Sequence, residues 1–153
     1  MKQSRLLKTV LFFSVMAFIL TGLIPLTFAK DKLKVGFVYV GPVGDIGWSY
    51  QHDLGRLSME KELGNDISTK IIEDVPEGAE AERVIRDLAK SGYNLIFTTS
   101  FGYMNPTLKV AKLFPKTTFV HATGYKQAKN VGTYMSRSYE GQYLTGMIAG
   151  KMT

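Results

Sequence analysis

Residues 33–64, LKVGFVYVGPVGDIGWSYQHDLGRLSMEKELG, decide the fold of this chain. Residues 33–40 are apolar and rich in valine, which predicts a buried strand. Residues 41–47 hold three glycines and a proline, which predicts a loop. Residues 48–63 mix leucines with charges at helical spacing, and Gly64 follows as a glycine that ends the helix. A strand, a loop and a helix in this order predict the first unit of an α/β sheet.

The alternation of strands and helices continues along the chain. Further strands are predicted at residues 67–73, 94–99, 117–122 and, more weakly, 131–135. One helix is predicted to open at Pro76 and close at Gly92, and another to have Asn105 as its cap and Pro106 as its first residue. A last helix is predicted over 139–152. The helix after Pro76 has one apolar stripe, formed by Ala81, Val84, Ile85, Leu88 and Ala89. This spacing predicts right-handed βαβ units and a parallel sheet.

Residues 1–29 have the layout of a cleavable signal peptide. Residues 1–8 are basic, residues 9–24 are almost wholly apolar, and small residues stand at 27 and 29, where a cleavage site needs them. An uncleaved anchor is the alternative, but the apolar run is short of the ~20 residues that a spanning helix needs. We therefore expect cleavage and a mature chain that begins near Lys30, in the periplasm or another extracytoplasmic space.

Composition excludes several classes of function. The 153 residues allow little more than one domain, and the absence of cysteine rules out disulfides, cysteine-ligated metals, a thiol nucleophile and a lipid-modified N-terminal cysteine. Outside residues 1–29 the chain has 16 of its 19 basic residues against 13 acidic ones, without a basic run, so nucleic-acid binding is not expected. Neither His52 nor His121 belongs to a metal-binding spacing, and we expect no metal and no cofactor.

A ligand site is predicted outside the carboxyl ends of the strands, where open parallel sheets bind small molecules. Asp45 and the only tryptophan, Trp48, follow the first strand, and an indole face beside polar groups suits a flat heterocycle. The alternative is that Asp45 caps a helix while Trp48 fills the core. Phe101, after the third strand, is either a second aromatic wall or packing. Glu140, beside Tyr139, lies near a crossover or is a simple first-turn acid.

Three segments resemble the basic membrane protein family, the PnrA-like substrate-binding components of ABC importers. They are KVGFVYVGPVGDIGWSYQHDLGR at 34–56, VPEGAEAERVIRDLAKSGYNLIFTTSFGYMNPTLKVAKLFP at 75–115 and SYEGQYLTGMIAGKM at 138–152. The resemblance implies the type I periplasmic-binding-protein fold, with a parallel-sheet N-terminal lobe over 30–136. Residues 137–153 would be the crossover and first helix of a second lobe that is largely missing. Since a helix without a following strand is an odd end for an α/β domain, we expect a truncated chain.

The resemblance also implies a function and a set of site residues. A purine nucleobase or nucleoside would be clamped between the lobes and passed to an ABC permease in the membrane. Asp45 would make a polar contact, Trp48 would stack on the base, and Ser49 takes the place of the small polar residue that follows the aromatic one. Phe101 would form the floor of the site. The crossover would add the last two implied site residues, Tyr139 and Glu140.

Other interpretations stay open. A nucleoside-processing enzyme on the same fold would need clustered carboxylates and a metal, and the first loop has only Asp45, so we expect no enzyme. A third interpretation is an inert truncated fragment, because half a clamp buries far less of a ligand. The chain also departs from its family at the end of the fourth strand, where some members have an acidic residue and this chain reads HATG at 121–124. We expect a monomer that binds a small molecule.

Overall fold

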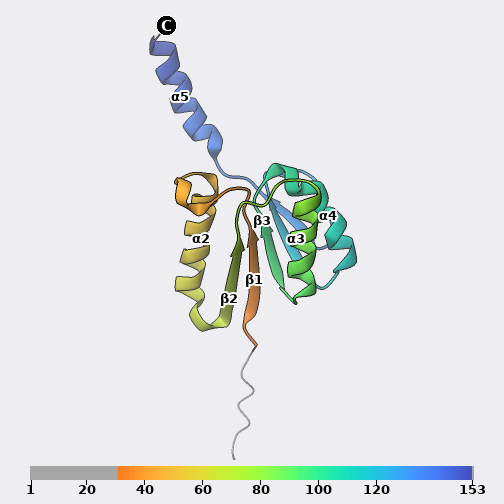
Figure 1. Cartoon of the computed structure of the whole chain (residues 1–153). Coiled ribbons are helices and arrows are strands. Elements are labelled where there is room, and N and C mark those ends of the chain that lie inside the picture. The colour runs from red at the N-terminus through yellow and green to blue at the C-terminus, as the bar shows by residue number, and fades with distance from the viewer. Residues whose placement is uncertain (1–30, 153) are drawn as a thin grey trace, which may run out of the picture. The chain divides into compact units, whose positions relative to one another are not determined.

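The computed structural model describes residues 31–152, apart from the side chain of Asp45. The strands in this range are β1 Leu33–Val38, β2 Ile67–Ile72, β3 Leu95–Thr98, β4 Thr118–Ala122 and β5 Val131–Tyr134. They form one sheet in the order β2-β1-β3-β4-β5, and every neighbouring pair is parallel (Figure 1). The predicted parallel α/β sheet is confirmed, with each strand shorter than predicted by one or two residues.

The helices in the same range are α2 Trp48–Leu63, α3 Ala79–Lys90, α4 Met104–Leu113 and α5 Ser138–Met152. Three short 3-10 turns accompany them: η1 Val43–Asp45, η2 Gly64–Asp66 and η3 Phe101–Tyr103. The prediction that Pro76 opens a helix is wrong, because the φ of 91° at Gly78 delays the helix to Ala79. Asn105 is not a cap either, since η3 runs directly into α4 and places Pro106 inside its first turn.

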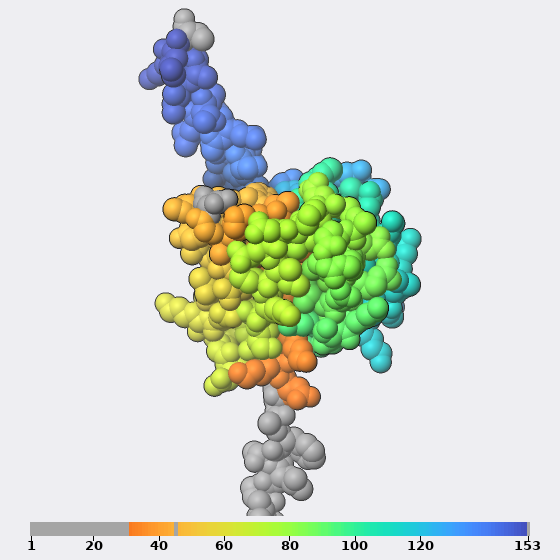
Figure 2. Space-filling model, in the orientation of Figure 1, coloured from red at the N-terminus to blue at the C-terminus, as the bar shows by residue number. Residues whose placement is uncertain are grey.

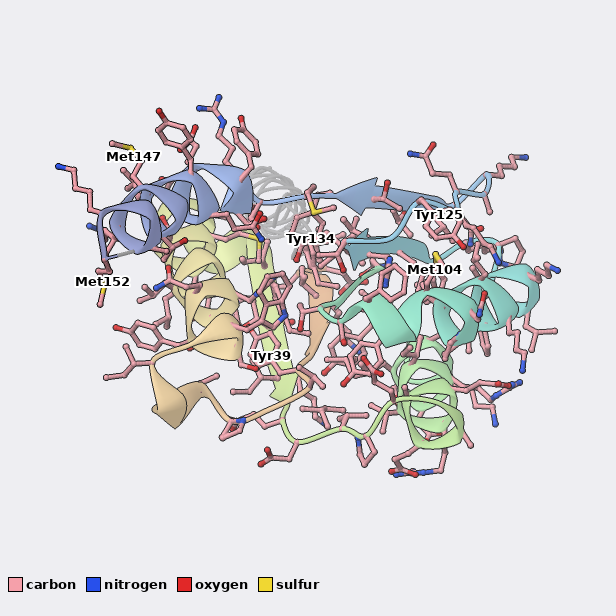
Figure 3. The ribbon with its side chains drawn as sticks, turned by 90° about the horizontal axis from the view of Figure 1, so that it is seen from above. Tyr39, Met104, Tyr125, Tyr134, Met147 and Met152 are labelled. Carbon is pink, nitrogen blue, oxygen red and sulfur yellow. The ribbon has the colours of Figure 1, made fainter. Side chains whose placement is uncertain are left out.

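Helices cover both faces of the sheet. α3 and α4 lie on one face and α2 lies on the other (Figures 1 and 3). On the first face, Val38, Ile96 and Phe119 pack with the stripe of α3, and all five residues of that predicted stripe are buried. On the second face, β1 contributes Val35 and Phe37, and Tyr39 follows directly after the strand. Side chains of β1 thus alternate between two cores, as the pleat of a strand requires.

Polar side chains hold α2 to the sheet. The buried residues of this helix are Ser49 and Asp53, whereas its leucines are exposed. Asp53 Oδ1 accepts hydrogen bonds from Tyr39 OH at 3.3 Å and from Arg56 Nε at 2.6 Å, and Arg56 Nη1 donates to Thr69 Oγ1 at 3.1 Å. Burial, followed by the charge of Asp53, raises the pKa of Tyr39, so its phenol stays a hydrogen-bond donor. Asp53 therefore joins α2 to β1, and Arg56 joins it to β2.

No helix within residues 31–152 has both the length and the apolar content to cross a bilayer. The signal peptide predicted over 1–29 lies outside the described residues. α5 has no buried residue, and the predicted boundary between residues 136 and 137 stays a prediction.

Candidate functional site

The strand order defines one place where a ligand would be expected. From β1 the chain crosses to β2 on one side and then to β3 on the other, so β1 and β3 flank a topological switch point. The carboxyl ends of these two strands lie side by side there, because Thr99 N, just after β3, donates at 3.2 Å to the carbonyl of Val38, the last residue of β1. In Figure 2 the orange atoms of residues 41–44 and 46–47 lie at the surface at the upper edge of the sheet unit. The predicted site residues from the first and third loops therefore share one edge.

The loop over 41–47 is held by hydrogen bonds at its first residues and is exposed near its last ones. Gly41 N donates to Ser49 Oγ at 3.3 Å, and Val43 N donates to Glu73 Oε1 at 2.7 Å. Ser49 is only 4% exposed, so its hydroxyl holds the loop in place, and its contact with a ligand stays a prediction. Ile46 has left-handed backbone angles (φ 46°, ψ 48°) and is 79% exposed. A β-branched residue seldom adopts this conformation, and such strain clusters at ligand sites.

Trp48 spans the switch point from the first residue of α2. Its Nε1 donates to Thr99 O, which joins the first loop to the end of β3. The side chain belongs to neither buried core and the residue is 40% exposed. The indole edge is therefore occupied by a backbone carbonyl, while ring surface remains available for stacking on a flat molecule. Stacking by Trp48 on a ligand stays a prediction.

His52 supports the indole from one turn further along α2. The two ring centroids lie 4.7 Å apart, and a His52 Nδ1 hydrogen bond to Trp48 O at 2.8 Å orients the imidazole. The ring of Tyr134, on β5, also lies near His52, with the two ring centroids 5.9 Å apart. Sequence reasoning missed this support, although a spacing of four residues on a helix does place two side chains in contact.

Phe101 lies on η3, in the loop after β3, and is 56% exposed. Its ring lies 6.4 Å from that of Tyr125, which is itself 71% exposed. The loop is held by Glu77, whose Oε1 accepts hydrogen bonds from Ser100 Oγ and from Gly102 N, the latter at 3.1 Å. Glu77 fixes the position of Phe101, and this role was not predicted, although the loops after β2 and β3 are expected at the same edge of the sheet.

Tyr139 and Glu140 are not brought to Trp48 by any contact in the described part of the chain, and the side chain of Asp45 lies outside what the structure describes. Asp45 is the last residue of η1. Tyr139 and Glu140 lie in the first turn of α5, where Tyr139 is 63% exposed and Glu140 Oε1 pairs with Arg137 Nη1 at 3.3 Å. Their roles in binding stay predictions.

His121 is buried at the end of β4. Its Nε2 makes a 2.7 Å hydrogen bond with Ser100 O and must be the donor, because a carbonyl only accepts. Burial lowers the pKa of His121, which favours the neutral ring. Its Nδ1 has no hydrogen-bond partner among the described residues. The imidazole therefore links β4 to the loop that carries Phe101.

Replacing Gly124 with alanine is expected to disturb this link. A Cβ at residue 124 would lie 2.0 Å from His121 Nδ1, so the imidazole or the loop must move. We expect a loss of about 1–3 kcal/mol in the free energy of unfolding, measured by urea titration. Gly132→Ala is the matched control, because a Cβ there meets nothing within 4 Å. Equal stability of the two variants would show that residue 124 is not packed against His121.

A separate hollow of about 390 Å³ lies between α2 and the sheet face that carries Phe37 and Phe97. Met59 and Tyr134 also line it, and its polar lining residues are Gln51, His52, Arg56 and Ser136. A purine needs several hydrogen-bonding partners placed around its edges. His52 lines this hollow and also contacts Trp48, so the hollow adjoins the site at the strand ends.

A parallel α/β lobe with exposed aromatic rings at its switch point has the arrangement of one half of a two-lobed solute-binding protein. The sequence model of the ABC transporter substrate-binding protein PnrA-like family matches residues 32–153. The chain belongs to this family, which confirms the resemblance found in the sequence. The family is one of substrate-binding proteins and not of enzymes.

Two curated relatives extend this comparison. A purine-binding protein of Brucella abortus (strain 2308) is 57% identical over 125 residues, which cover 82% of this chain and 36% of the relative. A putative ABC transporter glucose-binding protein of Haloferax volcanii is 37% identical over 123 residues, which cover 80% of this chain and 31% of the relative. The chain thus spans about a third of the length of each relative.

Solved structures show the same fold. A solute-binding protein of an ABC transporter system from Conexibacter woesei aligns with a TM-score of 0.58 at 21% identity, over 67% of this chain and 35% of that one. A fragment of a putative lipoprotein from Peptoclostridium difficile aligns with a TM-score of 0.60 at 26% identity, over 80% of this chain and all of that one. These likenesses confirm the fold class, with the described chain covering one lobe.

Proposed function

We propose that this chain is the N-terminal lobe of an extracytoplasmic binding protein that captures a purine nucleobase or nucleoside for an ABC importer. The observation that carries the proposal is the exposed ring of Trp48 at the switch point between β1 and β3. The name of the Brucella abortus relative, a purine-binding protein at 57% identity, supports the same class of ligand.

The proposed recognition divides between stacking and hydrogen bonding. The indole of Trp48 is fixed by Thr99 and His52, so little freedom is lost when a base stacks on it. Stacking on an aromatic side chain accepts any base, because every base has a π face. Selection among purines must therefore come from polar groups, and Asp45 and the backbone of the 41–47 loop are the candidates in this lobe.

The proposed protein binds its ligand without chemical change. A second lobe would close over Trp48 and Phe101 by a hinge motion, with Tyr139 and Glu140 in the crossover, and a membrane permease would sense the closed form. The signal peptide predicted over 1–29 would place the protein outside the cytoplasm. It would act as a monomer and need no cofactor.

Calorimetric titration of the full-length protein with adenine, adenosine, guanosine and glucose tests the proposal. We expect saturable heat with at least one purine and none with glucose, which is included because the Haloferax volcanii relative is named a glucose-binding protein. Product analysis after incubation with inosine tests the alternative that the protein is a nucleoside-processing enzyme. We expect the inosine to be recovered unchanged. Binding of glucose alone, or release of a free base from inosine, would contradict the proposal.

A further inference from the structure

The two halves of the chain differ in charge. Between Leu88 and Tyr139 the sequence has no aspartate or glutamate. The basic residues of this stretch are Lys90, Lys109, Lys112, Lys116, Lys126, Lys129 and Arg137. Along the sequence these residues are scattered, and no run of lysines draws attention to them. The fold decides whether they gather on one surface.

The structure brings three of these lysines together. A groove of about 720 Å³ lies between α4 and the loop that joins β4 to β5, and its lining includes Lys109, Lys112 and Lys126. The loop is anchored to the helix because Lys126 Nζ donates to Asn105 Oδ1 at 3.3 Å. Figure 3 shows Tyr125, which precedes Lys126 on this loop. We call this surface, defined by Asn105, Lys109, Lys112, Lys126 and Gln127, the basic groove.

The charges of the basic groove are largely uncompensated. Among the described residues, Lys109 pairs with Glu82 of α3 at 3.3 Å, and Lys112 and Lys126 form no salt bridge. All three lysines are exposed. The acids of the neighbouring helix α3 offer little further neutralisation, because Glu80 and Asp87 pair with Arg83. A cluster of unpaired lysines creates a positive potential, and this potential attracts an acidic partner.

We propose that the basic groove docks an acidic segment of a partner protein. A hollow lined by lysines fits a chain that enters it, whereas a bilayer presents a flat plane of phosphates. Leu108 and Ala128 also line the groove, and they can pack against the aliphatic parts of glutamate side chains. This proposal does not depend on which ligand the lobe binds.

Fluorescence anisotropy with a labelled peptide of alternating glutamate and serine tests the proposal. The wild-type chain should bind this peptide, and binding should weaken as salt is raised, because exposed charge pairs are screened. The double variant Lys112→Glu/Lys126→Glu should bind about tenfold more weakly. The milder Lys112→Gln/Lys126→Gln should fall between the two. Far-ultraviolet circular dichroism checks that each variant is folded.

The control variant Lys61→Glu/Lys90→Glu changes the net charge equally on exposed residues of α2 and α3. It should retain at least half of the wild-type affinity. A peptide of alternating glutamine and serine should not bind. The proposal is overturned if the control variant loses as much affinity as the groove variant, or if the glutamine peptide binds equally well. Absence of binding to the glutamate peptide, with binding to phosphatidylglycerol vesicles that needs Lys112 and Lys126, would assign the groove to a membrane surface instead.

Discussion

Trp48→Ala is expected to weaken purine binding by about ten- to hundredfold, which corresponds to the ~1–3 kcal/mol that one base–aromatic stack contributes. The reason is geometric, because the indole is held across the switch point by Thr99 and His52 and leaves ring surface open. Calorimetric titration of the full-length variant with the preferred purine measures the loss. The fold should persist, since a side chain that is 40% exposed contributes only part of its area to the core.

The variant Trp48→Phe separates two roles of the indole: stacking on the base, and the hydrogen bond that holds the ring in position. Phenylalanine keeps an aromatic face but cannot donate to Thr99 O as the indole nitrogen does. We expect an intermediate affinity, closer to the wild type than to Trp48→Ala. If Trp48→Ala binds purines as tightly as the wild type and melts at the same temperature, the ring does not contact the ligand.

Asp53→Ala is expected to lower the free energy of unfolding by about 2 kcal/mol. Removing this carboxylate takes its 2.6 Å partner from the half-buried guanidinium of Arg56, which keeps only Glu60 Oε1 at 3.0 Å and Thr69 Oγ1 at 3.1 Å, and it leaves Tyr39 OH without an acceptor. The side chains of Asp53 and Arg56 are only 12% and 13% exposed, so water replaces the lost contacts poorly. Urea titration followed by circular dichroism measures the change.

Asp87→Ala is the matched control for this prediction. Asp87 also pairs with an arginine on a helix, Arg83, at 3.0 Å, but the two side chains are 53% and 60% exposed. Exposed pairs contribute about 0–1 kcal/mol. A loss at Asp53 no larger than the loss at Asp87 would show that α2 is held by its other contacts.

The sequence was sufficient to predict the sheet and α3, and insufficient to predict how α2 is held. α3 has one apolar stripe, and all of its members from Ala81 to Ala89 are buried as periodicity predicts. α2 has no such stripe, because Asp53 faces the sheet while Leu54 and Leu57 are exposed. The spacing of apolar residues therefore predicts helices that pack through apolar side chains. It does not predict the packing of a helix that is held by hydrogen bonds, as α2 is.

The sequence predicted the aromatic residues of the candidate site. It did not predict the residues that hold the loops of the site in place. Trp48 and Phe101 follow strands in the sequence, and the structure leaves both exposed at the same edge of the sheet. Glu77 and His121 hold the loop of Phe101 from two other strand ends. These contacts join residues that are far apart in the chain, and a single sequence gives no signal for such pairs. The gathering of lysines at the basic groove escaped prediction for the same reason.

The central claim is that Trp48 forms a wall of the ligand site, and its intrinsic fluorescence tests this claim most directly, because the sequence has no other tryptophan. Adenine is titrated into the full-length protein while the indole emission and the heat of binding are recorded in parallel. We predict a change in emission whose midpoint coincides with that of the heat. Heat of binding with unchanged emission would place the purine elsewhere and contradict the account.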